Sequence, residues 1–311
     1  MTGFTSPDHF LEVDDFDAVT LKAVLSAAQE WKTNPLAVPR CLEGKGAALL
    51  FEKPSTRTRV STEMAIVTLG GHPVSLRGEE VGLGVRESAR DIAKMLSGYC
   101  SLIGARVKDH RELEAMASVA SVPVINLLSD RSHPCQAVAD LLTLREHFGE
   151  LDGRRIAFIG DGNNVVASLA YAAALSGLEI AVSSPSGYEL DSDVVARAHN
   201  LGGTIELISD PYEAVAGADA IYTDVWTSMG QEDQSDIRRA AFAGYQINEA
   251  LMATAGPKAV FLHCLPAHRG EEVAAEVIDG AQSLVWQQAE NRMHATRAVI
   301  VQLLGESSEG I

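Results

Sequence analysis

Short apolar runs alternate with stretches of helical periodicity along most of the chain. In the helix expected at residues 14–31, apolar residues recur at helical spacing and Asp14 stands where a cap is needed. In the helix expected at 57–69, Val60, Met64 and Val67 share one face. Further helices are expected at 88–98, 110–119, 134–148, 164–176, 191–200, 211–216 and 288–304, with helical turns between 236 and 254. Strands are expected at 46–51, 73–76, 101–105, 122–127, 155–160, 179–183, 204–208, 219–223 and 259–264.

Strands joined by helices of this length predict parallel sheets with helices on both faces. The alternation restarts near residue 150, so we expect an α/β fold with two open parallel-sheet α/β domains of similar size, linked by interdomain helices. The first domain is expected to span 1–133 and to be joined by the C-terminal helix, 288–311. The linking helix is 134–149, and the second domain is 150–287. Ligands of open parallel sheets bind beyond the carboxyl ends of the strands, and these ends are the places to search for chemistry.

Composition narrows the possible partners. The 311 residues carry a formal net charge of −17, which argues against nucleic acid and anionic membranes as partners. No run reaches about 18 uninterrupted apolar residues, so no membrane span is expected, and the acidic N-terminus lacks a signal-peptide pattern. A cytoplasmic location is therefore expected. The four cysteines form no C-x-x-C pair, which disfavours a zinc ribbon.

The stretch FEKPSTRTRV, which follows the first strand, places two arginines at the start of a helix. Arg57 and Arg59 oppose the partial positive charge of a helix N-terminus, which suggests that an anion binds there. Pro54 turns the chain, and the helix start offers free backbone N–H groups beside a fixed guanidinium. Hydroxyls come from Ser55, Thr56 and Thr58. This combination predicts an anion site of the phosphate type.

Two more strand ends in the first half carry polar side chains. Arg106 follows the strand at 101–105, and the segment HPCQ follows the strand at 122–127. His133 and Gln136 lie on the first turn of the next helix and can face the same crevice. A further arginine, Arg292, is expected in the first turns of the last helix, again against the helix dipole.

In the second half, the segment FIGDGNNVV is similar to a dinucleotide-binding turn. Gly160 and Gly162 fit the first two glycines of that pattern, but Val165 occupies the third position and no acidic residue ends the following strand. A nicotinamide cofactor is therefore not expected. The amides of Asn163 and Asn164 suit a zwitterionic amino acid instead.

The last two strand ends carry the segments DVWTSMG and HCLPAHRG. Asp224 is placed to hold an ammonium group, and Cys264 and Leu265 reach the crevice. A metal cluster of His263, Cys264 and His268 fits no standard ligand spacing. A Cys–His nucleophile pair remains an alternative, although neighbours in one strand point to opposite faces.

The segments FEKPSTRTR, HPCQ, GDGNN, DVWTSMG, HCLPAHRG and ENRMHA occur in the order seen in ornithine carbamoyltransferases. The chain resembles the aspartate/ornithine carbamoyltransferase family over roughly residues 8–305. STRTR and HP-x-Q alone would also fit the aspartate enzymes, whereas DVWTSMG and HCLP favour ornithine.

The resemblance implies transfer of the carbamoyl group from carbamoyl phosphate to the δ-amine of L-ornithine, which gives L-citrulline and phosphate in arginine biosynthesis. It implies no metal and no organic cofactor. The first domain would bind carbamoyl phosphate and the second L-ornithine, in a homotrimer with active sites at subunit interfaces. The expected catalytic residues are Arg106, His133 and Cys264. The expected carbamoyl phosphate contacts are Ser55, Thr56, Arg57, Thr58, Arg106, His133, Gln136, Cys264, Leu265 and Arg292, and the expected ornithine contacts are Asn164, Asp224, Ser228 and Met229.

The implied chemistry is attack by a neutral amine on a carbonyl carbon. Negative charge develops on the carbonyl oxygen and then on the departing phosphate, where fixed cations stabilise it. A free amine with a pKa near 10 is mostly protonated at neutral pH, so activity is expected to rise towards alkaline pH.

Two residues depart from the family pattern. Thr62 stands where relatives generally have Phe, and we expect this to be a packing change. Gly82 stands where relatives usually place Gln or His, which reaches a neighbouring subunit's carbamoyl phosphate site.

Two alternatives stay open. One is a carbamoyltransferase for another amine, such as putrescine or an N-acylated ornithine. The other is a non-catalytic paralogue that binds the ligands without turnover.

Overall fold

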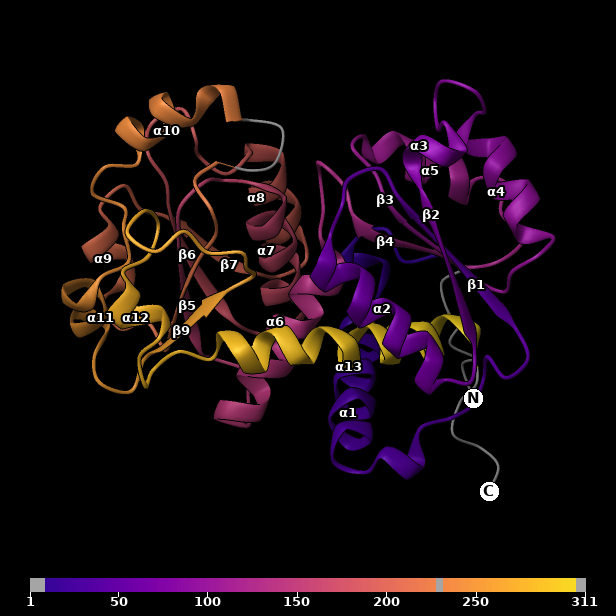
Figure 1. The fold of residues 1–311 in the computed structure, drawn as a ribbon. Helices are drawn as coiled ribbons and strands as arrows, with labels where there is room; N and C mark the ends of the chain where they lie inside the picture. Colours follow the sequence, from indigo (N-terminus) through magenta and orange to yellow (C-terminus); the bar gives the residue numbers. More distant parts are fainter. Residues whose placement is uncertain (1–8, 228–231, 306–311) are drawn as a thin grey trace. The chain divides into compact units, whose positions relative to one another are not determined.

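Two all-parallel β-sheets organise the chain, one in each of two units (Figure 1). The computed structural model describes residues 9–227 and 232–305. Unit 1 spans Met1–Leu142 and Glu290–Ile311, and unit 2 spans Thr143–Ala289. The chain passes between the units within two helices, α6 (Pro134–Phe148) and α13 (Val285–Leu304). This confirms the predicted fold class of two parallel-sheet α/β domains joined by helices.

The sheet of unit 1 has four strands in the order β2-β1-β3-β4. Its strands are β1 (Gly46–Phe51), β2 (His72–Arg77), β3 (Ile103–Arg106) and β4 (Val124–Leu128). Its helices before α6 are α1 (Ala18–Thr33), α2 (Thr56–Thr68), α3 (Gly78–Val81), α4 (Ala89–Ser97) and α5 (His110–Ala117). Two 3-10 turns, Val13–Asp15 and Pro35–Ala37, precede β1.

The sheet of unit 2 has five strands in the order β7-β6-β5-β8-β9. Its strands are β5 (Arg155–Ile159), β6 (Glu179–Ser183), β7 (Thr204–Leu207), β8 (Ala220–Thr223) and β9 (Val260–His263). Its helices are α7 (Asn164–Ser176), α8 (Ser192–Asn200), α9 (Pro211–Val215), α10 (Ser235–Ala241), α11 (Glu249–Ala255) and α12 (Ala275–Ile278), with a 3-10 turn at Glu232–Gln234.

Crossover direction places helices on both faces of each sheet. In unit 1, α4 and α5 pack on the face to which Ala48 and Leu50 point. Because the β1-to-β2 crossover runs the opposite way along the sheet, its helix α2 lies on the other face (Figure 1). In unit 2, the chain steps from β5 to β7 in one direction along the sheet and from β8 to β9 in the other. The helices α7 and α8 therefore cover one face, and α9 and α11 cover the other. Each sheet therefore has a switch point, β1/β3 in unit 1 and β5/β8 in unit 2, where ligands of such sheets bind.

Three local predictions were wrong. The first helix begins at Ala18 with Asp17 as its cap, because Asp14 belongs to a separate 3-10 turn. The last helix begins at Val285 rather than near 288. Arg292 therefore lies about two turns inside α13, beyond the reach of the N-terminal dipole charge.

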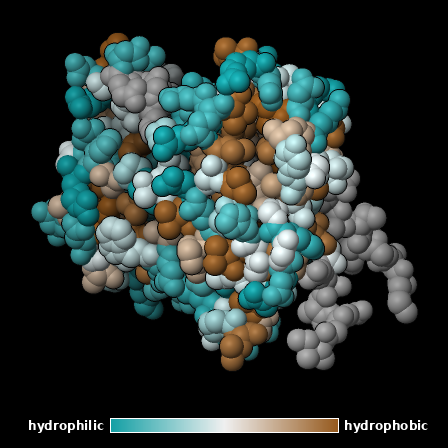
Figure 2. Space-filling view, turned by 45° about the vertical axis from the view of Figure 1, so that its right-hand side comes forward, coloured by the Kyte–Doolittle hydropathy of each residue, from teal (hydrophilic) through white to brown (hydrophobic). Residues whose placement is uncertain are grey.

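The apolar face of α2, whose helical spacing suggests that it packs in the core, is exposed instead. The buried residues of this helix are Thr58, Thr62, Ala65 and Ile66. Val60, Met64 and Val67, which share the other face, are all exposed by more than 40%. Figure 2, which brings the right-hand side of the Figure 1 view forward, shows apolar surface among polar residues. No helix among the described residues has the length and apolar character needed to cross a membrane.

Candidate active site

The first candidate site lies at the switch point of unit 1, where β1 and β3 end side by side. Phe51 and Arg106 are register partners at the ends of these strands. The chain then turns into α2, whose N-cap is Ser55, with its hydroxyl 3.4 Å from the backbone nitrogen of Thr58. Thr56 opens the helix and is exposed. This helix start brings backbone N–H groups to the strand ends, as the sequence predicts.

The two arginines of this turn differ in their surroundings. Arg57 is half-buried at the helix start, whereas Arg59 is exposed. Within the described residues, no carboxylate lies in ion-pair range of the Arg57 guanidinium, so no described carboxylate neutralises its charge. That is the arrangement expected of an arginine that binds an anion.

Three helices meet at Arg292 in unit 1. Its Nη1 donates to Gln136 Oε1 at 2.6 Å, and its Nη2 donates to Thr58 Oγ1 at 3.0 Å. Gln136 is itself fixed by a 2.7 Å bond from its Nε2 to Asp140 on the next turn of α6. All of these side chains are buried. The cation at Arg292 is therefore held by side chains of α2 and α6, not placed against a helix dipole.

His133 directly precedes α6 and lies close to the guanidinium groups of Arg292 and Arg106. It is buried, and burial lowers the pKa of its imidazole well below the ordinary value, with Arg292 and then Arg106 lowering it further. Its ring is therefore neutral at physiological pH and can donate one N–H. Arg106 is buried at the end of β3. The structure thus brings together Thr58, Arg106, His133, Gln136 and Arg292, which the sequence places far apart.

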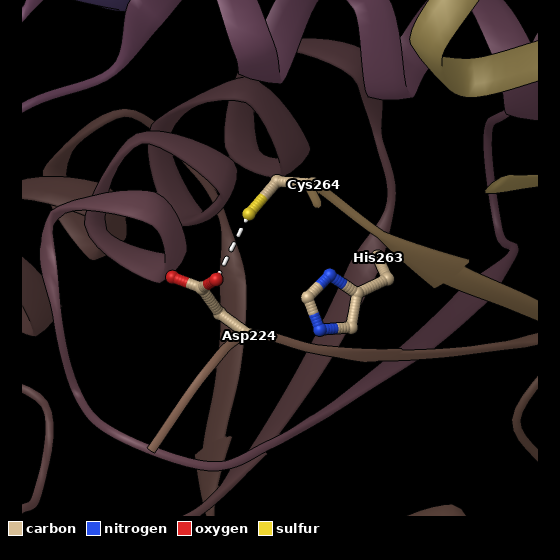
Figure 3. A group of neighbouring side chains, drawn as sticks. All are labelled: Asp224, His263 and Cys264. Carbon is tan, nitrogen blue, oxygen red and sulfur yellow. Dashed lines mark hydrogen bonds between the residues drawn. The ribbon is translucent and has the colours of Figure 1, made fainter. Parts of the chain in front are cut away.

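The second candidate site lies at the switch point of unit 2, where β5 and β8 end. Asp224 follows β8 and is buried. Its carboxylate accepts a bond of 2.9 Å from Asn163 Nδ2 and another of 2.9 Å from the Cys264 thiol. Figure 3 shows the Cys264 sulfur directed at this carboxylate, with the His263 ring close by but not bonded to either. Asn164 opens α7 beside them. Ser228 and Met229, the other expected ornithine contacts, lie outside the described residues.

A second carboxylate lies at this edge of the sheet and was not predicted from the sequence. Asp161, just after β5, forms an ion pair with Arg238, which also donates to the backbone oxygen of Trp226. The Arg238 guanidinium lies over the rings of Tyr188 and Phe242. Burial raises the pKa of Asp161 to about 6, against the opposing effect of Arg238. Arg238 sits in a polar stretch of α10, so no sequence pattern marked it as buried.

The HCLP turn follows β9 and contains an unusual backbone. Leu265 has φ of 59°, and its peptide bond to Pro266 is cis. Cys264 and Leu265 are half-buried. Leu265 packs partly against the core of unit 2.

The contacts of His263 argue against both the metal cluster and the Cys–His nucleophile pair. The ligand atoms of Asp224, His263 and Cys264 do lie within 4.8 Å of one another. However, His263 Nδ1 accepts the Leu265 backbone N–H at 2.8 Å, and Nε2 lies 3.2 Å from Glu272 Oε1. Neither ring nitrogen is left to ligate a metal or to deprotonate Cys264.

The glycine turn of unit 2 has a structural explanation. A Cβ on Gly162 would lie 2.4 Å from the backbone of Glu189 and Leu190. The second glycine of this pattern is therefore required by close backbone packing within the unit.

Comparisons with known proteins also divide the chain into two parts, although the second match includes residues after Ala289 that the structure places in unit 1. Residues 8–146 match the carbamoyl-P binding domain of aspartate/ornithine carbamoyltransferase, and residues 152–303 match its Asp/Orn binding domain. The chain belongs to the aspartate/ornithine carbamoyltransferase family. An ornithine carbamoyltransferase of Acidothermus cellulolyticus is 49% identical over 300 residues, which cover 95% of this chain and 96% of that protein. An anabolic ornithine carbamoyltransferase of Pyrococcus furiosus is 47% identical over 299 residues, covering 94% of this chain and 95% of that protein.

Solved structures of the carbamoyltransferase family superimpose closely. Ornithine carbamoyltransferase from Pyrococcus furiosus gives a TM-score of 0.92 at 46% identity, covering 97% of this chain and 99% of that chain. The acetylornithine transcarbamylase solved with acetylcitrulline gives 0.84 at 30% identity, covering 96% of this chain and 99% of that one. The ornithine carbamoyltransferases of Acidothermus cellulolyticus and Pyrococcus furiosus are therefore more similar in sequence to this chain than that acetylornithine enzyme is.

Proposed function

We propose that this chain transfers the carbamoyl group of carbamoyl phosphate to the δ-amine of L-ornithine, releasing L-citrulline and phosphate in arginine biosynthesis. The observation that carries the proposal is the cluster of Arg106, His133, Gln136 and Arg292 around Thr58 at the switch point of unit 1. A cluster of buried cations and neutral donors suits a substrate with a phosphate at one end and a carbamoyl group at the other.

In unit 1, the phosphate binds at the start of α2. Ser55, Thr56, Arg57 and Thr58 offer hydroxyls, backbone N–H groups and one guanidinium that no described carboxylate neutralises. Arg106 adds a second guanidinium from the adjacent strand end. These donors are aimed before the reaction starts, so they stabilise the charge that builds on the leaving phosphate without reorganising.

The carbamoyl group takes the neutral donors of unit 1. Because the lowered pKa keeps His133 neutral, its ring N–H donates to the carbonyl oxygen without adding another positive charge beside Arg106 and Arg292. Arg106 shares that oxygen as negative charge develops on it. Gln136 contacts the carbamoyl amine, and Arg292 orients Gln136 through the 2.6 Å bond to its side-chain oxygen.

In unit 2, Asp224 holds the ammonium end of ornithine, and further contacts to ornithine come from Asn164, Ser228 and Met229. Asn163 orients the Asp224 carboxylate through their 2.9 Å bond. Cys264 and Leu265 remain proposed contacts to carbamoyl phosphate, with Cys264 as a catalytic residue. No step of this proposal uses a metal or an organic cofactor.

The test is citrulline formation from carbamoyl phosphate, with ornithine, putrescine and N-acetylornithine compared as acceptors. Ornithine should be used with the highest kcat/KM, because Asp224 and its neighbours fit a free amino-acid end. A higher kcat/KM for putrescine or acetylornithine would replace ornithine in this proposal. Binding of carbamoyl phosphate without turnover of any acceptor would support the non-catalytic alternative.

The proposal includes a homotrimer with active sites at subunit interfaces. Val60, Met64 and Val67 of α2 and Val74 of β2 expose apolar side chains on one sheet edge and its adjoining helix, and such a face suits burial by another subunit. Met64→Lys should lower the mass measured by light scattering from that of a trimer. Val19→Lys, at an exposed apolar position of α1, is the matched control and should leave the trimer intact. A monomeric wild-type chain would contradict this part.

The proposed location is the cytoplasm. All four cysteines are described, none of them forms a disulfide, and Cys41 and Cys135 are buried. Free thiols are typical of reducing compartments.

A further inference from the structure

A fully buried pair of side chains, His263 and Glu272, lies directly behind the Cys264–Leu265 turn. Neither side chain has any exposed surface. His263 ends β9, where its backbone N–H donates to Gln288 at 2.9 Å, and Glu272 lies nine residues further on. A buried carboxylate is strongly unfavourable unless donors surround it, so its contacts define its role.

The contacts of His263 fix which ring nitrogen carries the proton. The Leu265 backbone nitrogen lies 2.8 Å from Nδ1, and a backbone N–H can only donate. Nδ1 is therefore the acceptor and carries no hydrogen. The single ring proton is on Nε2, which donates to Glu272 Oε1 at 3.2 Å. Glu272 thus selects the tautomer that Leu265 needs.

The same carboxylate oxygen also holds the far end of the turn. Glu272 Oε1 accepts the backbone N–H of His268 at 2.5 Å. Between these two fixed points, Leu265 has φ of 59°, a left-handed conformation that costs a non-glycine residue roughly 1–2 kcal/mol. Such a conformation persists only where the surrounding contacts determine it.

We propose that His263 and Glu272 are positioning residues for the proposed reaction. They hold residues 264–268 from behind, so that Leu265 keeps its left-handed backbone and the Cys264 thiol stays 2.9 Å from Asp224. The pair touches no substrate itself. Its kinetic consequence rests on the proposed function, whereas its effect on the turn does not.

Two substitutions of His263 separate positioning from packing. His263→Asn places an amide oxygen near the position of Nδ1 and can still accept the Leu265 N–H. His263→Phe keeps the ring volume but has no acceptor. Positioning predicts that the Phe variant loses about 10- to 100-fold in kcat while the Asn variant stays within about 3-fold of wild type, because small misplacements of reacting groups cost factors of that size. A packing role predicts the reverse order.

A second measurement follows the turn without catalysis. Alkylation of Cys264 by iodoacetamide, followed by peptide mass spectrometry, reports whether the thiol still donates to Asp224. The rate should be unchanged in His263→Asn and raised in His263→Phe, because a thiol released from a carboxylate acceptor is freer to react. If wild type forms no citrulline, the proposed function fails and alkylation alone decides the positioning.

Glu272 provides an independent pair of variants. Glu272→Gln keeps an acceptor oxygen and should resemble wild type in both measurements, whereas Glu272→Met has none and should match His263→Phe. His110→Phe is the control for general destabilisation, because His110 is also a buried histidine, bonded to Ser129 in unit 1. It should leave kcat and Cys264 alkylation unchanged. Equal effects of the two substitutions at 263, or at 272, would overturn the proposal.

Discussion

Arg292→Met tests the centre of the proposed carbamoyl phosphate site. Methionine keeps much of the apolar stem but removes the guanidinium, which bonds Gln136 Oε1 at 2.6 Å and Thr58 Oγ1 at 3.0 Å. The Thr58 hydroxyl can rotate to another partner, but Gln136 is held in place by Asp140, so its buried carbonyl is left without this donor. One unsatisfied buried acceptor costs about 1–3 kcal/mol, and we expect unit 1 to lose about 2 kcal/mol of unfolding free energy.

Loss of the same cation should weaken carbamoyl phosphate binding. A charge-assisted hydrogen bond contributes about 1.5–3 kcal/mol, so the KM for carbamoyl phosphate is expected to rise about 10- to 150-fold. The pKa of His133 should also rise, because Arg292 is one of the two cations that lower it. Steady-state kinetics, urea denaturation and histidine NMR titration measure the three effects.

Arg59→Met is the matched control for this variant. Arg59 is an exposed arginine of α2, close in sequence to Thr58. It should change neither the KM nor the His133 titration. A KM for carbamoyl phosphate that stays within about twofold of wild type in Arg292→Met would refute the reasoning, as would an equal rise in Arg59→Met.

Four further predictions follow from single residues. Arg57→Ala should abolish turnover through lost carbamoyl phosphate binding, whereas Arg59→Lys should be milder; equal kinetic losses would contradict separate roles. Thr62→Val should raise the free energy of unfolding by about 1 kcal/mol in urea, because the buried Thr62 hydroxyl has no hydrogen-bond partner among the described residues; a loss of stability would show a hidden partner. Gly82→Gln should lower the KM for carbamoyl phosphate, at a cost of about 1 kcal/mol because φ is 70° and its Cβ would meet the Arg86 side chain; an unchanged or higher KM would reject it. Asp161 has a folded pKa of about 6 against an ordinary 3.8, so its contribution to stability is complete below about pH 4 and is lost as the pH rises through 6. Wild type should therefore lose up to about 3 kcal/mol of unfolding free energy over this range, and Asp161→Asn should not show this loss. The same pH dependence in both proteins would contradict the assignment.

Strand ends could be predicted well because the signals there are local. The bounds expected for the strand at 46–51 and for the helix at 164–176 agree with β1 and α7. In both cases a short apolar run or a strong periodicity ends at turn residues. The polar groups that follow the strands could then be found from one topological rule.

Helix faces and buried charges could not be predicted in the same way. On α2, hydropathy predicts that Val60 is buried and Thr62 exposed, but the valine is exposed and the threonine is buried. Arg238 and Glu272 are also buried, although each lies among polar neighbours. Their partners, Asp161 and His263, belong to other elements, and no periodicity within one segment encodes a pair formed across the fold.

The helix α13 also has a consequence for the order in which the protein forms. Unit 2 is continuous in sequence, whereas unit 1 is built from both ends of the described chain. The bond between Thr58 and Arg292 joins residues 234 positions apart. Contacts of such separation close late, and domains fold as their residues leave the ribosome. Unit 2 can therefore assemble first, and unit 1 acquires the cation at its centre only after Arg292 has been synthesised.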